Sequence, residues 1–186
     1  MEKSLSSIRE HLYWRYATLG MAMDARKRGI DKYDRTSFSI RNALFRDLMS
    51  GEKKPQSFYN DERYKMLNAG KCVYCGSSDA VSVDHVLPRA KGVDDNPANL
   101  VFCCKRCNSS KGAKDMIQWQ LQTGEFPPLY MIQRYFKLVI AYCEENGLMD
   151  KSIEEISYDS LPFSLQSLTV VFPHPIGFNK LDKDTQ

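Results

Sequence analysis

Two closely spaced cysteine pairs constrain the fold of this chain more than any other feature. Cys72 and Cys75 form one C-x2-C pair, and Cys104 and Cys107 form a second after 28 intervening residues. Such a pair lets one turn present two thiolates to a single ion, and two pairs complete a tetrahedral zinc site. We therefore predict a structural Zn²⁺ held by all four sulfurs. Because sulfur would fill every coordination position, this ion is not expected to activate water.

The two remaining cysteines are interpreted as small hydrophobic residues. Cys103 falls in an apolar run, and Cys143 falls on the apolar face of an expected helix, where a free cysteine commonly packs as an apolar side chain. Replacing Cys104 by Cys103 as a ligand would give the less favoured C-x3-C spacing. Four unrelated buried cysteines are the alternative, and the matched spacing argues against it.

The overall composition is that of an ordinary folded protein. The chain has 186 residues, 42% of them hydrophobic and 26% charged, which suits one domain or one core with an appended element. No apolar run approaches the ~18 residues of a membrane helix, and the first residues lack the hydrophobic region of a signal peptide. A cytoplasmic location is therefore expected, where cysteines bind metal or remain thiols.

Charge is unevenly distributed along the chain. Residues 1–71 contain 15 Lys and Arg against 9 Asp and Glu, residues 72–115 contain 6 against 5, and residues 116–186 contain 5 against 9. A basic N-terminal third is compatible with a polyanion docking on one side, and equally with scatter on a solvated surface. The candidate contacts for DNA or a partner there are Arg26, Lys27, Arg28, Arg35, Arg41, Lys53 and Lys54.

Hydrophobic periodicity predicts an α+β fold that is mostly helical. Helices are expected over residues 7–28, 37–50, 61–68, 105–121 with a break near Gly112, and 127–147. Alternating Val81 and Val83, and the apolar run 100–103, predict two short strands between the cysteine pairs. A further strand is expected over residues 168–172, and residues 180–186 are expected to be a polar tail.

Polar residues accompany the two strands between the cysteine pairs. Asp84 and His85 end the first strand, Asn99 precedes the second, and Asn108 follows the last cysteine. An imidazole is suited to proton transfer near neutral pH, and carboxylate and amide oxygens suit Mg²⁺ or Mn²⁺. Adjacent strand residues point to opposite faces, so Asp84 and His85 can share a site only where the strand ends or bends.

The segment 72–112 resembles the HNH endonuclease family, whose core is a hairpin and a helix that grip a metal (the ββα-metal fold). The matching elements, in order, are Cys72, Cys75, Asp84, His85, Pro88, Asn99, Cys104, Cys107, Asn108 and Lys111. Two positions depart from the usual pattern. Asn108 stands where many members have His, giving an H-N-N variant as in the HNH domain of RNA-guided CRISPR effectors. Gly92 stands alone where many members have a glycine pair.

The resemblance implies a metal-dependent nuclease or nickase that hydrolyses DNA phosphodiester bonds. In this interpretation His85 is the general base, Asp84 and Asn108 hold one catalytic Mg²⁺ or Mn²⁺, and Asn99 steadies the loop that carries the histidine. The alternative for Asn99 is an Asx-type turn residue after Pro97. Candidates for phosphate contacts, or equally for solvated surface residues, are Lys111, Arg89, Lys105 and Arg106.

Three regions follow from this interpretation: a basic helical region (1–70), an HNH core (71–123) and a C-terminal helical extension with a tail (124–186). The alternative functions are an inert zinc module that binds nucleic acid or protein, and a nuclease directed at RNA. The presence of Asp84, His85 and Asn108 together favours the enzyme. DNA is the expected partner, with a protein supplying specificity as a further possibility, and bacterial anti-phage defence or restriction is the expected context.

Overall fold

The structure is a computed structural model that describes residues 5–78, 81–91, 93, 96–156 and 161–183. Its helices are α1 (Ile8–Lys27), α2 (Arg35–Met49), α3 (Tyr59–Leu67), α4 (Lys105–Lys111), α5 (Met116–Gln122), α6 (Leu129–Glu145) and α7 (Lys180–Lys183), and its strands are β1 (Val81–His85) and β2 (Leu100–Cys104). The mostly helical α+β class predicted from the sequence is confirmed. Gly92 and residues 184–186 lie outside the described residues.

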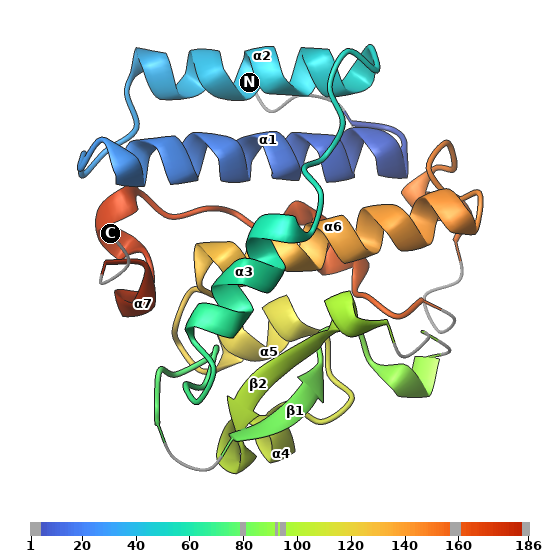
Figure 1. Cartoon of the computed structure of the whole chain (residues 1–186). Coiled ribbons are helices and arrows are strands. Elements are labelled where there is room, and N and C mark those ends of the chain that lie inside the picture. The colour runs from blue at the N-terminus through green and yellow to red at the C-terminus, as the bar shows by residue number, and fades with distance from the viewer. Residues whose placement is uncertain (1–4, 79–80, 92, 94–95, 157–160, 184–186) are drawn as a thin grey trace.

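Helices α1 and α2 pack side by side as the outer layer of the molecule (Figure 1). Each begins with a reciprocal capping box: Ser7 with Glu10 in α1, and Asp34 with Ser37 in α2. These caps satisfy backbone N–H groups that a helix start leaves without partners. Gly29 ends α1 with a φ of +67°, a conformation that glycine adopts without a steric penalty.

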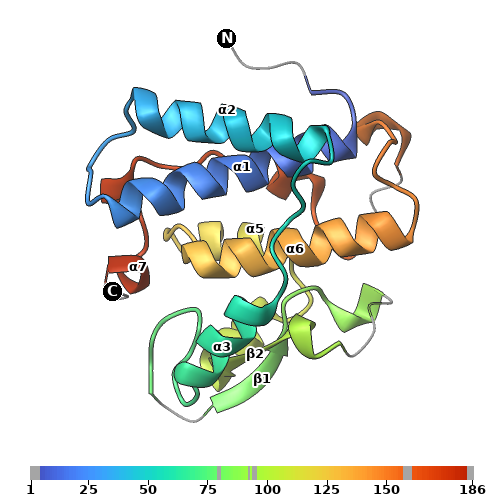
Figure 2. The same ribbon diagram turned by 45° about the horizontal axis from the view of Figure 1, so that its top comes forward.

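Helix α6 forms the middle layer, between the α1–α2 pair and the small sheet (Figures 1 and 2). Its Ile132, Phe136 and Val139 are fully buried, and Leu12 of α1 packs into the same core. The core continues into the sheet through Val101. One hydrophobic core therefore joins the long helices to the segment between the cysteine pairs.

Strands β1 and β2 form an antiparallel pair below α6, and α4 follows β2 directly (Figure 1). In the register, Val81 lies opposite Cys104 and His85 lies opposite Leu100. Helix α4 packs against both strands and ends at Gly112, whose φ is +52°. The predicted pair of strands and the following helix are present as a ββα unit.

The prediction of a strand over residues 168–172 is wrong. Residues 165–169 form a 3-10 helix, and in the described part of the chain the sheet contains β1 and β2 alone. Leu168, Val170 and Phe172 are buried and Val171 is 78% exposed, so the side chains alternate as in a strand. In the described part of the chain no strand pairs with this backbone, and Arg15 of α1 instead donates to the Leu168 carbonyl at 2.8 Å.

The C-terminal segment also differs from the expectation. Residues 180–183 form the short helix α7 instead of a polar tail, because buried Asp182 accepts from the backbone N–H of Leu129 at the start of α6. Among the described residues, none of the helices combines the length and the apolar character that crossing a membrane requires.

Candidate metal centre and active site

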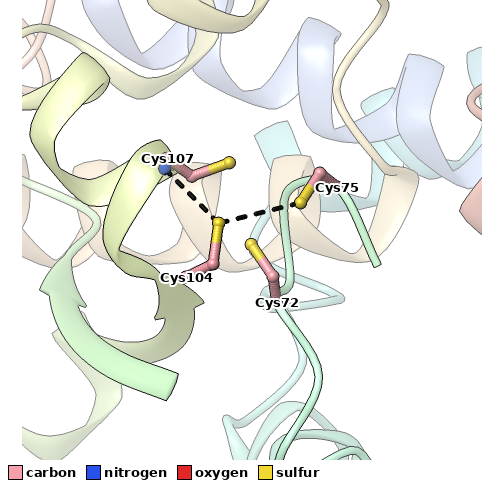
Figure 3. A group of neighbouring side chains, drawn as sticks. All are labelled: Cys72, Cys75, Cys104 and Cys107. Carbon is pink, nitrogen blue, oxygen red and sulfur yellow. Dashed lines mark hydrogen bonds between the residues drawn. The ribbon is translucent and has the colours of Figure 1, made fainter. Parts of the chain in front are cut away.

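The four predicted zinc ligands lie together (Figure 3). Cys72 and Cys75 come from the turn before β1, Cys104 ends β2, and Cys107 lies in the first turn of α4. Their Sγ atoms all lie within 4.8 Å of one another, and those of Cys75 and Cys104 are 3.9 Å apart. Tetrahedral zinc with Zn–S bonds of about 2.3 Å implies S–S separations of about 3.8 Å. The cluster therefore fits Zn²⁺ in donor type and in spacing.

Local backbone geometry forms the two cysteine turns. In the first, the Gly76 N–H donates to the Cys72 carbonyl at 2.8 Å, with Gly76 at a φ of +76°. In the second, the Cys107 N–H donates to Cys104 Sγ at 3.4 Å. Burial opposes ionisation of Cys104, but hydrogen bonds from Cys107 and the neighbouring thiols outweigh it and lower the pKa of Cys104. Burial raises the pKa of Cys107. Binding of zinc would displace the protons of these thiols.

Cys103 and Cys143 stand apart from the cluster, as the spacing indicates. Both are fully buried free thiols, and burial raises the pKa of Cys103 to about 11 and that of Cys143 to about 12. Cys104 occupies the cluster and Cys103 does not. The C-x2-C assignment of the second pair is therefore the one that the geometry supports.

Asp84 faces inward, between β1 and α4. Its side chain is 6% exposed; Tyr74 donates to Oδ2 at 2.7 Å, and Lys111 Nζ lies 3.2 Å from the same oxygen. Burial, reinforced by the nearby carboxylate, raises the pKa of Tyr74. A buried carboxylate requires such partners because desolvation without them is costly. Sequence reasoning missed Tyr74, which lies between two zinc ligands and has no chemical signature of its own.

Lys111 is a buried lysine, which corrects the expectation of an exposed side chain that touches phosphate. It is 1% exposed, and its ammonium also donates to the His85 carbonyl at 2.7 Å. Helix α4 lies directly on β1, so the side chain one turn after Asn108 points into the sheet instead of toward solvent. Lys111 thereby joins the helix to the two strand residues that carry the proposed chemistry.

His85 is the last residue of β1 and is half-buried. The chain after it is held by Asn99, whose Oδ1 accepts from the Leu87 N–H at 2.8 Å and whose Nδ2 donates to the Leu87 carbonyl at 3.0 Å. The Val86 N–H donates to the Asn99 carbonyl. These contacts are those expected of a residue that steadies the histidine loop. The Asx-type contact in this segment is made instead by Asn96.

Asn108 fastens α4 to β1. Its Nδ2 donates to the Val83 carbonyl at 3.1 Å and to Ser82 Oγ at 3.2 Å. Ser82 and Asp84 point to the same face of β1 because side chains alternate along a strand. Asn108, Asp84 and Lys111 therefore meet on the α4 side of the strand, beside its end at His85.

The donor types on this face fit a hard cation. The Asp84 carboxylate and the Asn108 amide oxygen are the ligands that Mg²⁺ or Mn²⁺ prefers. The carboxylate is held by Lys111 and Tyr74, so a cation there would share Asp84 with these groups or displace the ammonium. Of the other candidate phosphate contacts, Arg89 lies in the loop after β1 and Lys105 and Arg106 lie in the first turn of α4; all three are exposed.

Comparisons with known proteins find a known family in the same segment of the chain. Residues 72–114 match the family model of HNH endonuclease. The chain is also similar to two proteins named CRISPR-associated endonuclease Cas9. The one from Corynebacterium diphtheriae is 32% identical over 115 residues, covering 56% of this chain and 10% of that protein; the one from Actinomyces naeslundii is 30% identical over 95 residues, covering 43% and 9%. No solved structure matches significantly.

The chain therefore contains an HNH endonuclease domain over residues 72–114, and the resemblance identified from the sequence is confirmed. It spans about a tenth of the length of the curated relatives it matches. The matched segment is the one that carries the four cysteines, both strands and α4.

Proposed function

We propose that this protein is a metal-dependent endonuclease or nickase that hydrolyses DNA phosphodiester bonds. The observation that carries the proposal is the arrangement around the end of β1. Asp84 and Asn108 lie on the face of β1 that α4 covers, and His85, the next residue after Asp84, ends the strand just before the loop that Asn99 holds. The match to the HNH family over the same residues supports it.

In the proposed mechanism, His85 accepts the proton of the attacking water. A half-buried imidazole at the end of a strand can reach bound water and is suited to this near neutral pH. Asn99 orients the loop, and Lys111 fixes the His85 carbonyl. Asp84 and Asn108 would hold one Mg²⁺ or Mn²⁺, which supplies Lewis-acid stabilisation of charge on the phosphate and the leaving oxygen.

The zinc cluster has a positioning role in this proposal. Cys104 ends β2, and Cys107 is the residue before Asn108. An ion held by these two residues and by Cys72 and Cys75 would fix the start of α4 relative to the sheet. A catalytic constellation needs such rigid support to keep its geometry.

Two alternatives remain outcomes of the test. An inert zinc module would bind nucleic acid or protein without cutting, and the presence of Asp84, His85 and Asn108 together favours the enzyme over this reading. A nuclease directed at RNA would use the same groups. We place the protein in the cytoplasm because the zinc cluster needs reduced cysteines, and the likeness to CRISPR-associated endonucleases favours a role in defence against foreign DNA or in restriction.

The test is cleavage of supercoiled plasmid with Mg²⁺, Mn²⁺ or EDTA, followed on agarose gels. Wild type is expected to nick or linearise the plasmid with a divalent cation and not with EDTA, and His85→Ala is expected to lose activity by a factor of about 10²–10⁴. The matched control is His174→Ala, an exposed histidine that stacks on Tyr33. Normal cutting by His85→Ala refutes the assigned base, and cleavage of RNA alone in parallel reactions selects the RNA alternative.

A further inference from the structure

Helix α3 exposes an apolar face that the nuclease assignment does not use. Tyr59, Met66 and Leu67 are 73%, 66% and 75% exposed. Positions seven and eight residues apart lie on one side of a helix, so the three side chains form a single outward strip. Large apolar side chains gathered at a surface in this way mark an interaction site more often than isolated ones do.

The charges of α3 are sorted between its two sides. Both acidic residues of α3 pair with cations of α6: Asp61 is 7% exposed with Lys137 Nζ at 2.5 Å, and Glu62, whose side chain is 36% exposed, lies 2.8 Å from Arg134. Arg63, within the outward strip, is exposed, and so is Lys71 shortly after the helix. The two carboxylates of α3 are thus paired with cations, and the outward strip is apolar with one basic residue, Arg63.

Helix α3 lies next to the strand that pairs with His85. Lys65 Nζ donates to the Leu100 carbonyl at 3.2 Å and to the Pro97 carbonyl at 3.0 Å. Leu100 is the residue opposite His85 in the two-stranded sheet. Figures 1 and 2 both show α3 running alongside the sheet. Adjacent strands are about 5 Å apart, so one bound duplex can reach both α3 and His85.

We propose that the outward face of α3, formed by Tyr59, Arg63, Met66 and Leu67 with Lys71 beside it, docks the DNA duplex that the HNH site cuts. This inference rests on the proposed function. Arg63 and Lys71 contact phosphates, and Met66 and Leu67 contact sugars and base edges in the minor groove, where apolar side chains serve as wedges. Within α3, the outward strip carries a basic residue and no acidic one, which is the charge complementarity that a polyanion requires.

The test is binding of a fluorescein-labelled duplex of about 20 base pairs, measured by anisotropy at several salt concentrations in a His85→Ala background that leaves the duplex intact. Arg63→Glu with Lys71→Glu is expected to weaken affinity by a factor of about 10–100 and to lower the slope of log affinity against log salt by about 2. Met66→Ser with Leu67→Ser is expected to weaken affinity about tenfold with the slope unchanged, because an apolar contact releases no counterions.

The matched control is Val171→Ser with Ile176→Ser, two apolar residues that are 78% and 64% exposed elsewhere on the chain. It is expected to bind within about twofold of the parent. Far-UV circular dichroism and thermal melting check that every variant folds. Binding by the Met66 and Leu67 variant equal to that of the control overturns the apolar contact, and an unchanged salt slope in the Arg63 and Lys71 variant overturns the phosphate contacts.

Plasmid cleavage separates this inference from the function on which it rests. If the wild type cuts DNA and both α3 variants bind the duplex normally, the inference about α3 is overturned, and its apolar face serves another partner such as a protein. If the wild type neither binds nor cuts DNA, the proposed function fails together with it. If the α3 variants bind the duplex more weakly and the Val171 and Ile176 variant does not, both the α3 inference and the proposed function are supported.

Discussion

The HNH domain and the helical layer of α1, α2 and α6 are stabilised in different ways. Helices α1 and α6, of 20 and 17 residues, bury long apolar stripes against each other. The HNH domain has two strands of five residues and a helix of seven. Its interior holds Asp84, Asn99 and Lys111, which are polar and at most 6% exposed. The HNH domain therefore depends mainly on specific bonds, and the helical layer depends mainly on buried area.

This difference determines which substitutions destabilise each region. Apolar packing is spread over many contacts, so a single change weakens the helical layer by a limited amount. A small unit held by an ion and by buried polar pairs loses its geometry when one of them is removed. The two tryptophans report the regions separately, since Trp14 packs edge-to-face with Phe45 of α2 and Trp119 packs edge-to-face with Tyr74 beside the cysteines.

The largest effect is expected from loss of the zinc site. Cys104→Ser with Cys107→Ser should remove the metal and unfold the HNH domain, because binding of a structural zinc ion contributes on the order of 10 kcal/mol to folding. In a Trp14→Phe background, the fluorescence of the cysteine double variant should show that Trp119 has lost its folded environment. In a Trp119→Phe background, its fluorescence should show that the region around Trp14 stays folded. Zinc content is measured by mass spectrometry, and Cys103→Ala is the control expected to keep one zinc per chain. A zinc-free double variant as stable as the wild type would contradict the stated difference between the HNH domain and the helical layer.

The next largest effect is expected at the buried ion pair. Lys111→Met leaves the Asp84 carboxylate buried with Tyr74 as its remaining partner among the described residues, and removing one partner of such a pair costs about 3–5 kcal/mol. Urea denaturation followed through Trp119 measures this. Combining Lys111→Met with Asp84→Asn should recover much of the loss, because the uncompensated charge is gone. Lys114→Met, at an exposed lysine of the same segment, is expected to change the free energy of unfolding little. A loss of stability as large as that of Lys111→Met would argue against the role of the Asp84–Lys111 ion pair.

Lys111 also shows how much of the site can be predicted from the sequence. The cysteine spacing predicted the cluster, and alternation and periodicity predicted β1, β2 and the long helices, because these patterns are local. The direction in which Lys111 points depends on how α4 lies on β1, a packing relation that no spacing encodes. Asn99 was assigned a supporting role by family resemblance, but its two bonds to Leu87 join residues twelve positions apart and required coordinates.

The segment 168–172 shows the complementary limit. Its alternation of buried and exposed side chains is that of a strand, and the sequence pattern was recognised correctly. A strand also needs a neighbour for its backbone groups, and in the described residues this segment lies against α1 instead. A periodic pattern therefore specifies which side chains are buried, and the partner decides which secondary structure results.

A moderate effect is expected in the helical layer. Leu12 of α1 is fully buried in the hydrophobic core, and Leu12→Ala should lower stability by about 2–5 kcal/mol through lost transfer energy and a cavity. Denaturation should be seen first through Trp14, and plasmid cleavage by the remaining folded protein should be unchanged. The control is Leu67→Ala, which removes the same atoms from an exposed side chain and leaves no cavity. Its free energy of unfolding is the quantity compared. Early loss of the Trp119 signal in Leu12→Ala would show that the two regions are not separately vulnerable.

The smallest effect is expected at Asp182, and it has the opposite sign. This carboxylate accepts from the Leu129 N–H at 2.9 Å, and burial raises its pKa to about 6. The native state therefore binds the proton more tightly than the unfolded state, whose pKa is near 3.8, and stability falls as pH rises from about 4 to about 6.

Asp182→Asn keeps an oxygen that can accept from Leu129 and removes the charge, so at pH 7.5 it should stabilise the protein by about 1–3 kcal/mol. The gain should vanish toward pH 4, where the native carboxyl is protonated. Urea denaturation at both pH values measures it, and an equal gain at both would contradict the role of burial. Neutralising Asp182 should thus strengthen the helical layer, whereas neutralising Lys111 weakens the HNH domain, because, among the described residues, the charge of Lys111 has a buried ionic partner and that of Asp182 does not.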